Sequence, residues 1–164
     1  MSDLQNVMYT TMSEGQLGQI SRLIPHTAKA MTINSVTASN VFGLAFTTTD
    51  NLNAIIGGTG IFAGILGRPH EHSSVGLANV SDYTAIQYET GLLMDTGAVD
   101  VEIDNAVLGG YVQFHQTTGV LSYVATSTPD ATNTLIKNAQ IESVYQTTTG
   151  TKKLCQLRIV GLNK

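Results

Sequence analysis

Two pairs of strand-like segments in the second half of the chain constrain its fold most strongly. In each pair, a run rich in β-branched, aromatic and other apolar residues leads into a Thr-Thr-Gly turn and resumes after it. The first pair covers residues 111–124 around Gly119, and the second covers residues 141–160 around Gly150. A hairpin loop often needs a residue with positive φ, which glycine adopts without a steric penalty. The two segments therefore predict two antiparallel β-hairpins.

Other segments extend the β pattern over the rest of the chain. Residues 99–104 alternate strictly between apolar and acidic side chains, which is the period of a strand with one buried face. Apolar runs at 30–46, 54–56 and 61–66 are interrupted by a polar turn cluster at 47–51. The chain also holds 22 threonines and 16 glycines but no tryptophan, a composition that suits strands and tight turns. We expect an all-β fold, a small sandwich or barrel built from hairpins.

The length of the chain, 164 residues, predicts one domain or two small lobes. Residues 1–12 are polar, with scattered methionine and tyrosine and no clear period, so we expect an extended N-terminal arm. Residues 13–164 are expected to form a β-rich body, which could divide into two lobes at the polar loop of residues 70–79. Residues 13–24 fit either a short helical turn or an irregular strand, and Pro25 ends that segment.

Cysteine count, hydropathy and charge exclude several classes of protein. The one cysteine, Cys155, excludes a disulfide framework within the chain and a zinc site made of several cysteines. No apolar run reaches the roughly 18 residues of a membrane-spanning helix, and the first residues lack the basic and apolar parts of a secretory signal. The net charge of −4 and the isoelectric point near 5.4 are unlike those of a nucleic-acid-binding protein. We therefore expect neither a membrane nor a nucleic acid as partner.

Three sequence features look like sites for ligands or catalysis, and each has a simpler structural explanation. Gly58-Thr59-Gly60 resembles a nucleotide-binding loop, but the run after it is too short for the helix that would meet a phosphate. His70-Glu71-His72 brings two imidazoles close together, but no third zinc ligand is evident. Cys155 lies in an alternating strand pattern, where a cysteine serves as a small apolar residue. We expect no enzymatic activity, no metal site and no cofactor.

Charged residues are distributed unevenly along the chain. Between Arg68 and Lys137 there are eight acids and no base, whereas residues 137–164 hold five bases and one acid. One explanation is that the acidic stretch forms a single solvated face. The other is that copies of the chain pair the acidic middle of one with the basic tail of the next, which fixes register more than it adds affinity. The residues of this second, predicted interface are Asp100, Glu102, Asp104, Lys152 and Lys153.

A series of glycine-rich and apolar motifs follows a recognisable order along the chain. Val41–Phe46 is a strand core of the apolar-Phe-Gly type, and Gly57–Arg68 is a glycine-rich segment that leads through an apolar run to a loop with His70. Gly91–Met94 precedes the acidic ladder, and Gly109–Leu121 has the pattern of a Gly-x-x-Val…Gly-x-Leu hairpin. This order resembles that of the head decoration, or structural cement, proteins of tailed bacteriophages.

The resemblance runs from about residue 9 to residue 160. It implies a non-enzymatic protein that binds the outer surface of a phage head and stabilises the contacts between neighbouring capsomers. It also implies a homo-oligomer, commonly a trimer, that is made in the host cytoplasm, has the major capsid protein as partner and resides on the outer capsid surface of the virion. Two alternatives stay open. A tail-tube or fibre component would form open rings or tubes, and a glycan-binding β domain would need Tyr83 or Tyr88 to line a cleft.

The N-terminal arm is the segment from which we expect a direct part in assembly. Its apolar residues include Met8, Tyr9 and Met12, so it is too apolar for a solvated tail and too irregular for a self-sufficient element. We expect these residues to become ordered by lying against a neighbouring protomer or the shell.

Overall fold

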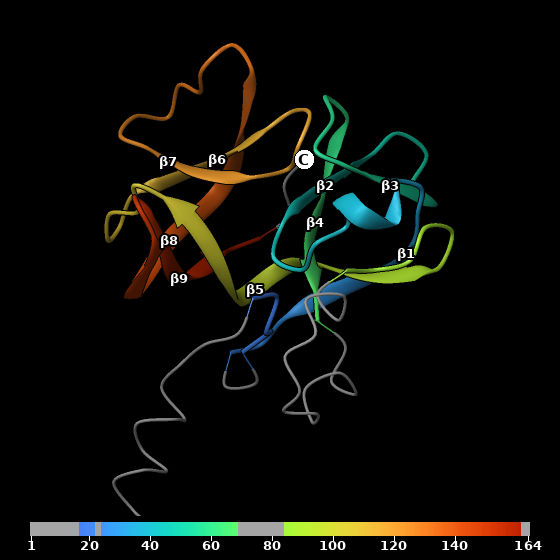
Figure 1. Cartoon of the computed structure of the whole chain (residues 1–164), viewed down its shortest axis with the longest axis horizontal. Coiled ribbons are helices and arrows are strands. Elements are labelled where there is room, and N and C mark those ends of the chain that lie inside the picture. The colour runs from blue at the N-terminus through green and yellow to red at the C-terminus, as the bar shows by residue number, and fades with distance from the viewer. Residues whose placement is uncertain (1–16, 22–23, 69–83, 162–164) are drawn as a thin grey trace, which may run out of the picture.

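The computed structural model in Figure 1 describes residues 17–21, 24–68 and 84–161. Within these residues the chain forms nine strands and one short 3-10 helix, so the predicted all-β class is confirmed. None of the helices in the described part could cross a membrane. The elements are β1 (Thr27–Ile33), η1 (Thr37–Ser39), β2 (Ala45–Thr48), β3 (Asn53–Ile56), β4 (Ile61–Gly67), β5 (Thr90–Asp104), β6 (Tyr111–His115), β7 (Leu121–Val124), β8 (Asn133–Thr149) and β9 (Lys152–Ile159).

The nine strands form two closed, barrel-like rings that share β5. The first ring runs in the order β1-β3-β2-β4-β5 and closes because β1 also pairs with β5. The second runs in the order β5-β7-β6-β8-β9 and closes because β9 also pairs with β5. Figure 1 shows the two rings side by side, with β5 passing from one to the other. Of the two predicted architectures, the barrel is the one formed.

The 15-residue strand β5 changes ring near its middle. Residues 90–96 pair with β1, and residues 97–104 pair with β9. On β1, Thr27 is opposite Thr96 and the next residue, Ala28, is opposite Met94. Asp95 is therefore an extra residue of β5 in this pairing and forms a bulge. The buried carboxylate of Asp95 lies 3.1 Å from the Lys29 Nζ, which neutralises its charge. A bulge bends a strand and increases its twist, which allows one strand to serve two rings.

Each ring has its own apolar interior. Phe46, Leu66 and Leu93 are fully buried in the first ring, whereas the neighbouring residues Ala45, Ile65 and Met94 belong to the core of the second. The last three lie in register on adjacent strands, because Ala45 is opposite Ile65 and Ile65 is opposite Met94. Successive side chains of a strand point to opposite faces, so parts of β2, β4 and β5 are buried on both faces. This explains why residues 61–66 are a continuous apolar run.

Two glycine turns join the rings through backbone contacts. The Gly119 carbonyl accepts a hydrogen bond from the Ala45 N–H at 3.0 Å, and the Gln116 carbonyl accepts one from the Gly58 N–H at 2.5 Å. Gly57 has a φ of +59°, and a Cβ there would lie 2.6 Å from the Gln116 oxygen. Glycine at these turns therefore allows the two rings to approach at backbone distance.

The predicted hairpins and turns are confirmed where the structure describes them. β6 pairs with β7 through a loop in which Gly119 has a φ of +67°, and β8 pairs with β9 around Gly150, whose φ is +59°. Gly58-Thr59-Gly60 is the turn between β3 and β4 rather than a phosphate loop. Ile20 forms an isolated bridge with Val99, which fits the irregular-strand alternative for this segment. Residues 70–79 lie outside the described residues, so a lobe boundary there stays a prediction.

Candidate functional site

The acidic strand and the basic tail that the sequence singles out meet within one chain. β5 and β9 are antiparallel neighbours, with Asp104 opposite Lys152. The Lys152 Nζ lies 3.0 Å from the Glu102 Oε1, and the Thr151 hydroxyl donates a hydrogen bond to Asp104. The Lys153 Nζ instead donates to the Ala106 carbonyl at 2.9 Å. Pairing of these groups between subunits stays a prediction, since the structure contains one chain.

Glu102, Asp104 and Lys152 also line a shallow pocket of about 220 Å³ at the junction of the two rings. Apart from these charged groups and one glycine, its lining residues are apolar: Leu17, Val41, Phe42, Leu44, Val120 and Leu121. Leu17 belongs to the segment before β1, so this segment also contributes to the pocket.

Asp100 differs from the other two acids of the ladder because it is buried, with 7% of its surface exposed. The segment before β1 covers it, since the Gly18 N–H donates to the Asp100 carbonyl and the Asp100 N–H donates to the Gln19 carbonyl. Burial raises the pKa of the Asp100 carboxyl to about 6, and a hydrogen bond from the Tyr145 hydroxyl, 3.3 Å away, opposes part of that rise. The expectation of a single solvated acidic face is therefore wrong for Asp100.

We expect Asp100→Asn to stabilise the protein at pH 8 but not near pH 4. The pKa of Asp100 in the folded protein, about 6, is above the ordinary value of 3.8 for an aspartate, so the folded state binds the proton more tightly. The cost of burying the charge is absent below pH 4, grows between pH 4 and 6, and is fully present above pH 6. Removing the charge should raise the free energy of unfolding at pH 8 by about 1–2 kcal/mol.

Denaturant unfolding at both pH values measures this effect. Glu89→Gln, at an exposed carboxylate before β5, is the matched control and should give no comparable gain at pH 8. An Asp100→Asn gain that is equal at both pH values would contradict burial of the charge as its cause.

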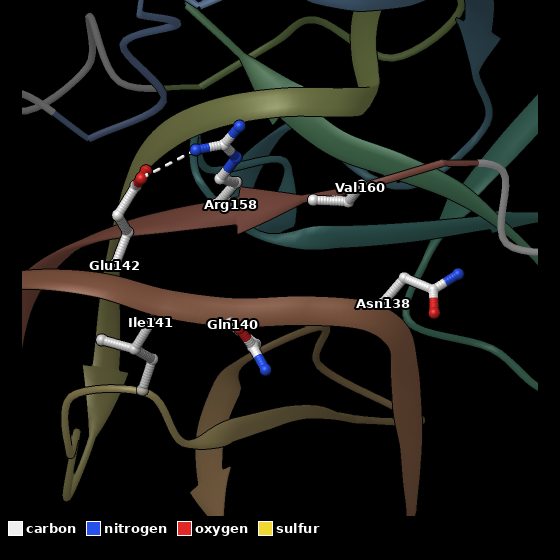
Figure 2. Close-up of a pocket in the computed structure, with 6 residues that line it drawn as sticks. All are labelled: Asn138, Gln140, Ile141, Glu142, Arg158 and Val160. Atoms are coloured by element: carbon white, nitrogen blue, oxygen red, sulfur yellow. Dashed lines mark hydrogen bonds and ion pairs between the residues drawn. The ribbon is translucent and has the colours of Figure 1, made fainter.

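A second pocket, of about 290 Å³, lies on β8 and β9 (Figure 2). Arg158 and Glu142 line it as an ion pair, with 2.9 Å between the Nη1 and the Oε1. The other lining residues are Asn138, Gln140, Ile141 and Val160. The carboxylate and the guanidinium neutralise each other, so this pocket does not present an unpaired acid or base for catalysis.

The remaining candidates for chemistry have no catalytic arrangement where the structure describes them. Burial raises the pKa of the Cys155 thiol to about 11, and its Sγ is 3.2 Å from the Lys153 carbonyl. A protonated, buried thiol is a poor nucleophile, so Cys155 serves as an apolar core residue. Throughout the described ranges, no three His, Cys, Asp or Glu side chains gather as metal ligands. His70-Glu71-His72 lies outside the described residues.

Four large apolar side chains are exposed near the end of β1. Val36 is 64% exposed, Leu52 71%, Ile86 53% and Tyr88 71%. They lie in three loops that follow β1, precede β3 and precede β5. We call these four residues the Tyr88 surface. It is a candidate contact surface, because aromatic and aliphatic side chains supply much of the energy at the centre of protein interfaces.

Comparison with known proteins identifies the family. The family model described as structural cement protein (E217 gp24/Pam3 gp6) matches residues 4–160, nearly the whole chain. The chain belongs to the phage structural cement protein family. A chain of a solved structure described as "The capsid of Myoviridae Phage XM1" shares the fold, with a TM-score of 0.61 and 11% sequence identity over 90% of this chain and 91% of that chain. No curated protein sequence matches.

Membership of the cement family confirms the resemblance found in the sequence and the capsid role that it implies. The protein is a structural, capsid-associated component of a phage virion. Among the predicted contact residues of this cement protein, Glu102, Asp104 and Lys152 lie together at one pocket, Asp100 is buried beneath the segment before β1, and Lys153 binds a carbonyl. Met8, Tyr9 and Met12 lie outside the described residues.

The sequence analysis did not identify Val36, Leu52 or Ile86 of this cement protein as contact residues. It considered Tyr88 only as a residue that would line a glycan-binding cleft. Tyr88 lines neither of the two pockets described above. A signal was present, because Leu52 lies inside the polar stretch Asp50-Asn51-Leu52-Asn53, where an apolar residue has no place in a strand period. An apolar residue isolated in a turn is a candidate for contact with a partner.

Proposed function

We propose that the protein binds the outer surface of a phage head, with the major capsid protein as its partner, and stabilises the contacts between neighbouring capsomers. The match of the cement family model to residues 4–160 is the observation that carries this proposal. The fold is consistent with it, because the two closed rings leave few unpaired strand edges among the residues that the structure describes. Unpaired edges promote uncontrolled association, which a protein present in many copies on one particle must avoid.

The proposed active form is a homo-oligomer, with a trimer favoured, and it performs no catalysis. Residues 13–164 act as its body and residues 1–12 as its arm. In this proposal Met8, Tyr9 and Met12 of the arm contact a neighbouring protomer or the shell. Contacts between subunits also involve the charged ladder of Asp100, Glu102, Asp104, Lys152 and Lys153, of which Glu102, Asp104 and Lys152 line the same pocket as Leu17.

Mixing the purified protein with expanded phage capsids tests the function directly. Negative-stain images should show regular, saturable decoration of the outer surface, and the purified protein should form small closed oligomers in solution. Open rings or tubes that leave capsids bare would favour a tail component instead. Binding to a glycan with no binding to capsids would favour a glycan-binding domain.

Deletion of residues 1–12 should leave the body folded and reduce capsid occupancy at least about tenfold. Covering about 300 Å² of apolar arm surface would supply roughly 7 kcal/mol. Ordering the backbone of all twelve residues costs more than that, at roughly 1–2 kcal/mol for each residue. The arm should therefore bind through added hydrogen bonds and the avidity of an oligomer. Circular dichroism checks the fold, and densitometry of sedimented capsids measures occupancy.

A matched pair of variants separates the apolar residues of the arm from its length. Replacing Met8, Tyr9 and Met12 with serine should reduce occupancy as the deletion does, whereas replacing Ser2, Gln5 and Asn6 with alanine should not. A deleted protein that forms its oligomer and decorates capsids at wild-type levels would show that the arm is dispensable.

A further inference from the structure

The Tyr88 surface is brought together by one buried asparagine and the end of β1. The Asn40 Nδ2 donates to the Ser35 carbonyl at 2.9 Å and to the Ala85 carbonyl at 3.1 Å. The residues that follow these two carbonyls are Val36 and Ile86, so a single amide group holds the two apolar loops next to each other. Asn40 is fully buried, which makes this connection a part of the folded body.

Leu52 and Tyr88 are tied to the last two residues of β1. The Thr32 N–H donates to the Leu52 carbonyl at 3.0 Å, and the Tyr88 N–H donates to the Ile33 carbonyl at 2.7 Å. The strand end therefore separates and fixes the two loops that carry these side chains. In Figure 1 the loop before β5 curls beside the end of β1, at the side of the first ring away from the second.

Tyr88 has a backbone conformation that its surroundings must impose. Its φ is +68°, a region that is unfavourable for a bulky residue. The adjacent Gln87 is held by two hydrogen bonds, since its N–H donates to the Thr37 Oγ1 at 3.0 Å and its Nε2 donates to the Asn34 carbonyl at 3.2 Å. Such conformations persist where neighbouring structure determines them, and they are common at binding sites. The ring of Tyr88 is thus presented to solvent by a pre-organised loop.

The border of the Tyr88 surface is acidic. Asp50, next to Leu52 in the turn between β2 and β3, accepts hydrogen bonds from the Leu52 and Asn53 N–H groups at 2.9 and 2.8 Å. These bonds, and one from the Asn53 side chain, hold the pKa of Asp50 well below its usual range, so its charge is fixed. Glu89 adds a second exposed acid directly after Tyr88. Residues 30–67 and 84–90 contain no lysine or arginine.

We propose that the Tyr88 surface docks into an apolar hollow of the major capsid protein that is bordered by lysine or arginine side chains. The inference rests on the proposed function and adds the surface and the chemistry of its partner. A second copy of this chain fits less well as the basic partner. Four of the six lysine and arginine side chains in the described part already bind an acid or a carbonyl within the chain, namely Lys29, Lys152, Lys153 and Arg158.

Tyr88→Gly is the decisive variant. Glycine adopts positive φ freely, so the substitution removes the aromatic ring and relieves the backbone without opening a core. Affinity for expanded capsids should fall at least about tenfold, as expected for an interface anchor, while the melting temperature and the oligomer size stay the same. Tyr88→Phe should retain most of the affinity. Tyr111→Ala, at an exposed tyrosine on the second ring, is the matched control and should bind as the wild type does.

Glu89→Gln tests the charge of the partner. It should weaken binding about two- to threefold at low salt and reduce the dependence of the affinity on salt, because a rim charge mainly affects association. An unchanged salt dependence would overturn the basic border. Wild-type affinity for Tyr88→Gly, or a change in its oligomer size, would overturn this docking surface while leaving the proposed function intact. Failure of the wild-type protein itself to bind capsids would instead reject the proposed function.

Discussion

Gly57→Ala should lower the free energy of unfolding by at least about 3 kcal/mol, whereas Gly150→Ala should lower it by only about 1 kcal/mol. Both glycines have a φ of +59°, so the conformational cost of a side chain is the same at the two positions. A Cβ at Gly57 would also lie 2.6 Å from the Gln116 oxygen, whereas a Cβ at Gly150 meets no atom within 4 Å. The difference between the two variants isolates the close approach of the two rings.

The Gly57 variant must displace backbone rather than a flexible side chain. The neighbouring Gly58 N–H bonds the Gln116 carbonyl, and the Gly57 N–H bonds the Ala45 carbonyl at 2.9 Å. Moving the turn away weakens both bonds. At roughly 2–4 °C per kcal/mol for a chain of this size, the melting temperature should fall by about 6–12 °C. Equal losses for the two variants in differential scanning calorimetry would show that the turn moves aside at no cost.

Phe114→Ala should be the other strongly destabilising change, with a loss of about 3–5 kcal/mol. Phe114 on β6 is fully buried in the core of the second ring. Its ring centroid is 6.0 Å from that of Phe62, which β4 of the first ring contributes. Truncation therefore leaves a cavity in one ring and removes an aromatic contact with the other.

Denaturant unfolding followed by fluorescence and by circular dichroism measures this loss. Tyr111→Ala removes a partly exposed aromatic residue from the same strand and should cost about 1 kcal/mol. We expect one transition with both probes, because both rings depend on β5 and on the contact of Phe114 with Phe62. Two separate transitions in the variant would contradict this dependence.

Local sequence pattern was sufficient for the hairpins and insufficient for the two longest strands. The predicted hairpin turns at Gly119 and Gly150 are confirmed. They could be predicted because period-2 alternation and a turn glycine are properties of adjacent residues. The predicted strand at 99–104 is only the second part of β5, which begins at Thr90. Gly91 and Gly97 weaken the strand signal there, yet both sites are tightly packed, because a Cβ would lie 2.6 Å from the Ile33 Cδ1 or 2.5 Å from the His26 Cβ.

The candidate contact residues also divide into those that the sequence identified and those that only the fold brings together. The sequence identified the acidic strand and the basic tail, but only the fold makes β5 and β9 neighbours, places Glu102 beside Lys152 and buries Asp100 under residues 17–21. The Tyr88 surface could not be predicted from any one segment. Its three loops are not adjacent in the chain and are assembled by Asn40 and the end of β1.

The sequence by itself determined the all-β class, the positions of the turns and, through the order of its motifs, the cement family. These properties depend on side-chain alternation and on glycine conformation, which act between adjacent residues. The tertiary structure alone decided that the strands close into two rings around a shared β5. Closure pairs residues 27–32 with residues 90–96 and residues 97–104 with residues 152–159. Such pairs join segments that lie far apart in the chain, so no single segment of the sequence reveals them.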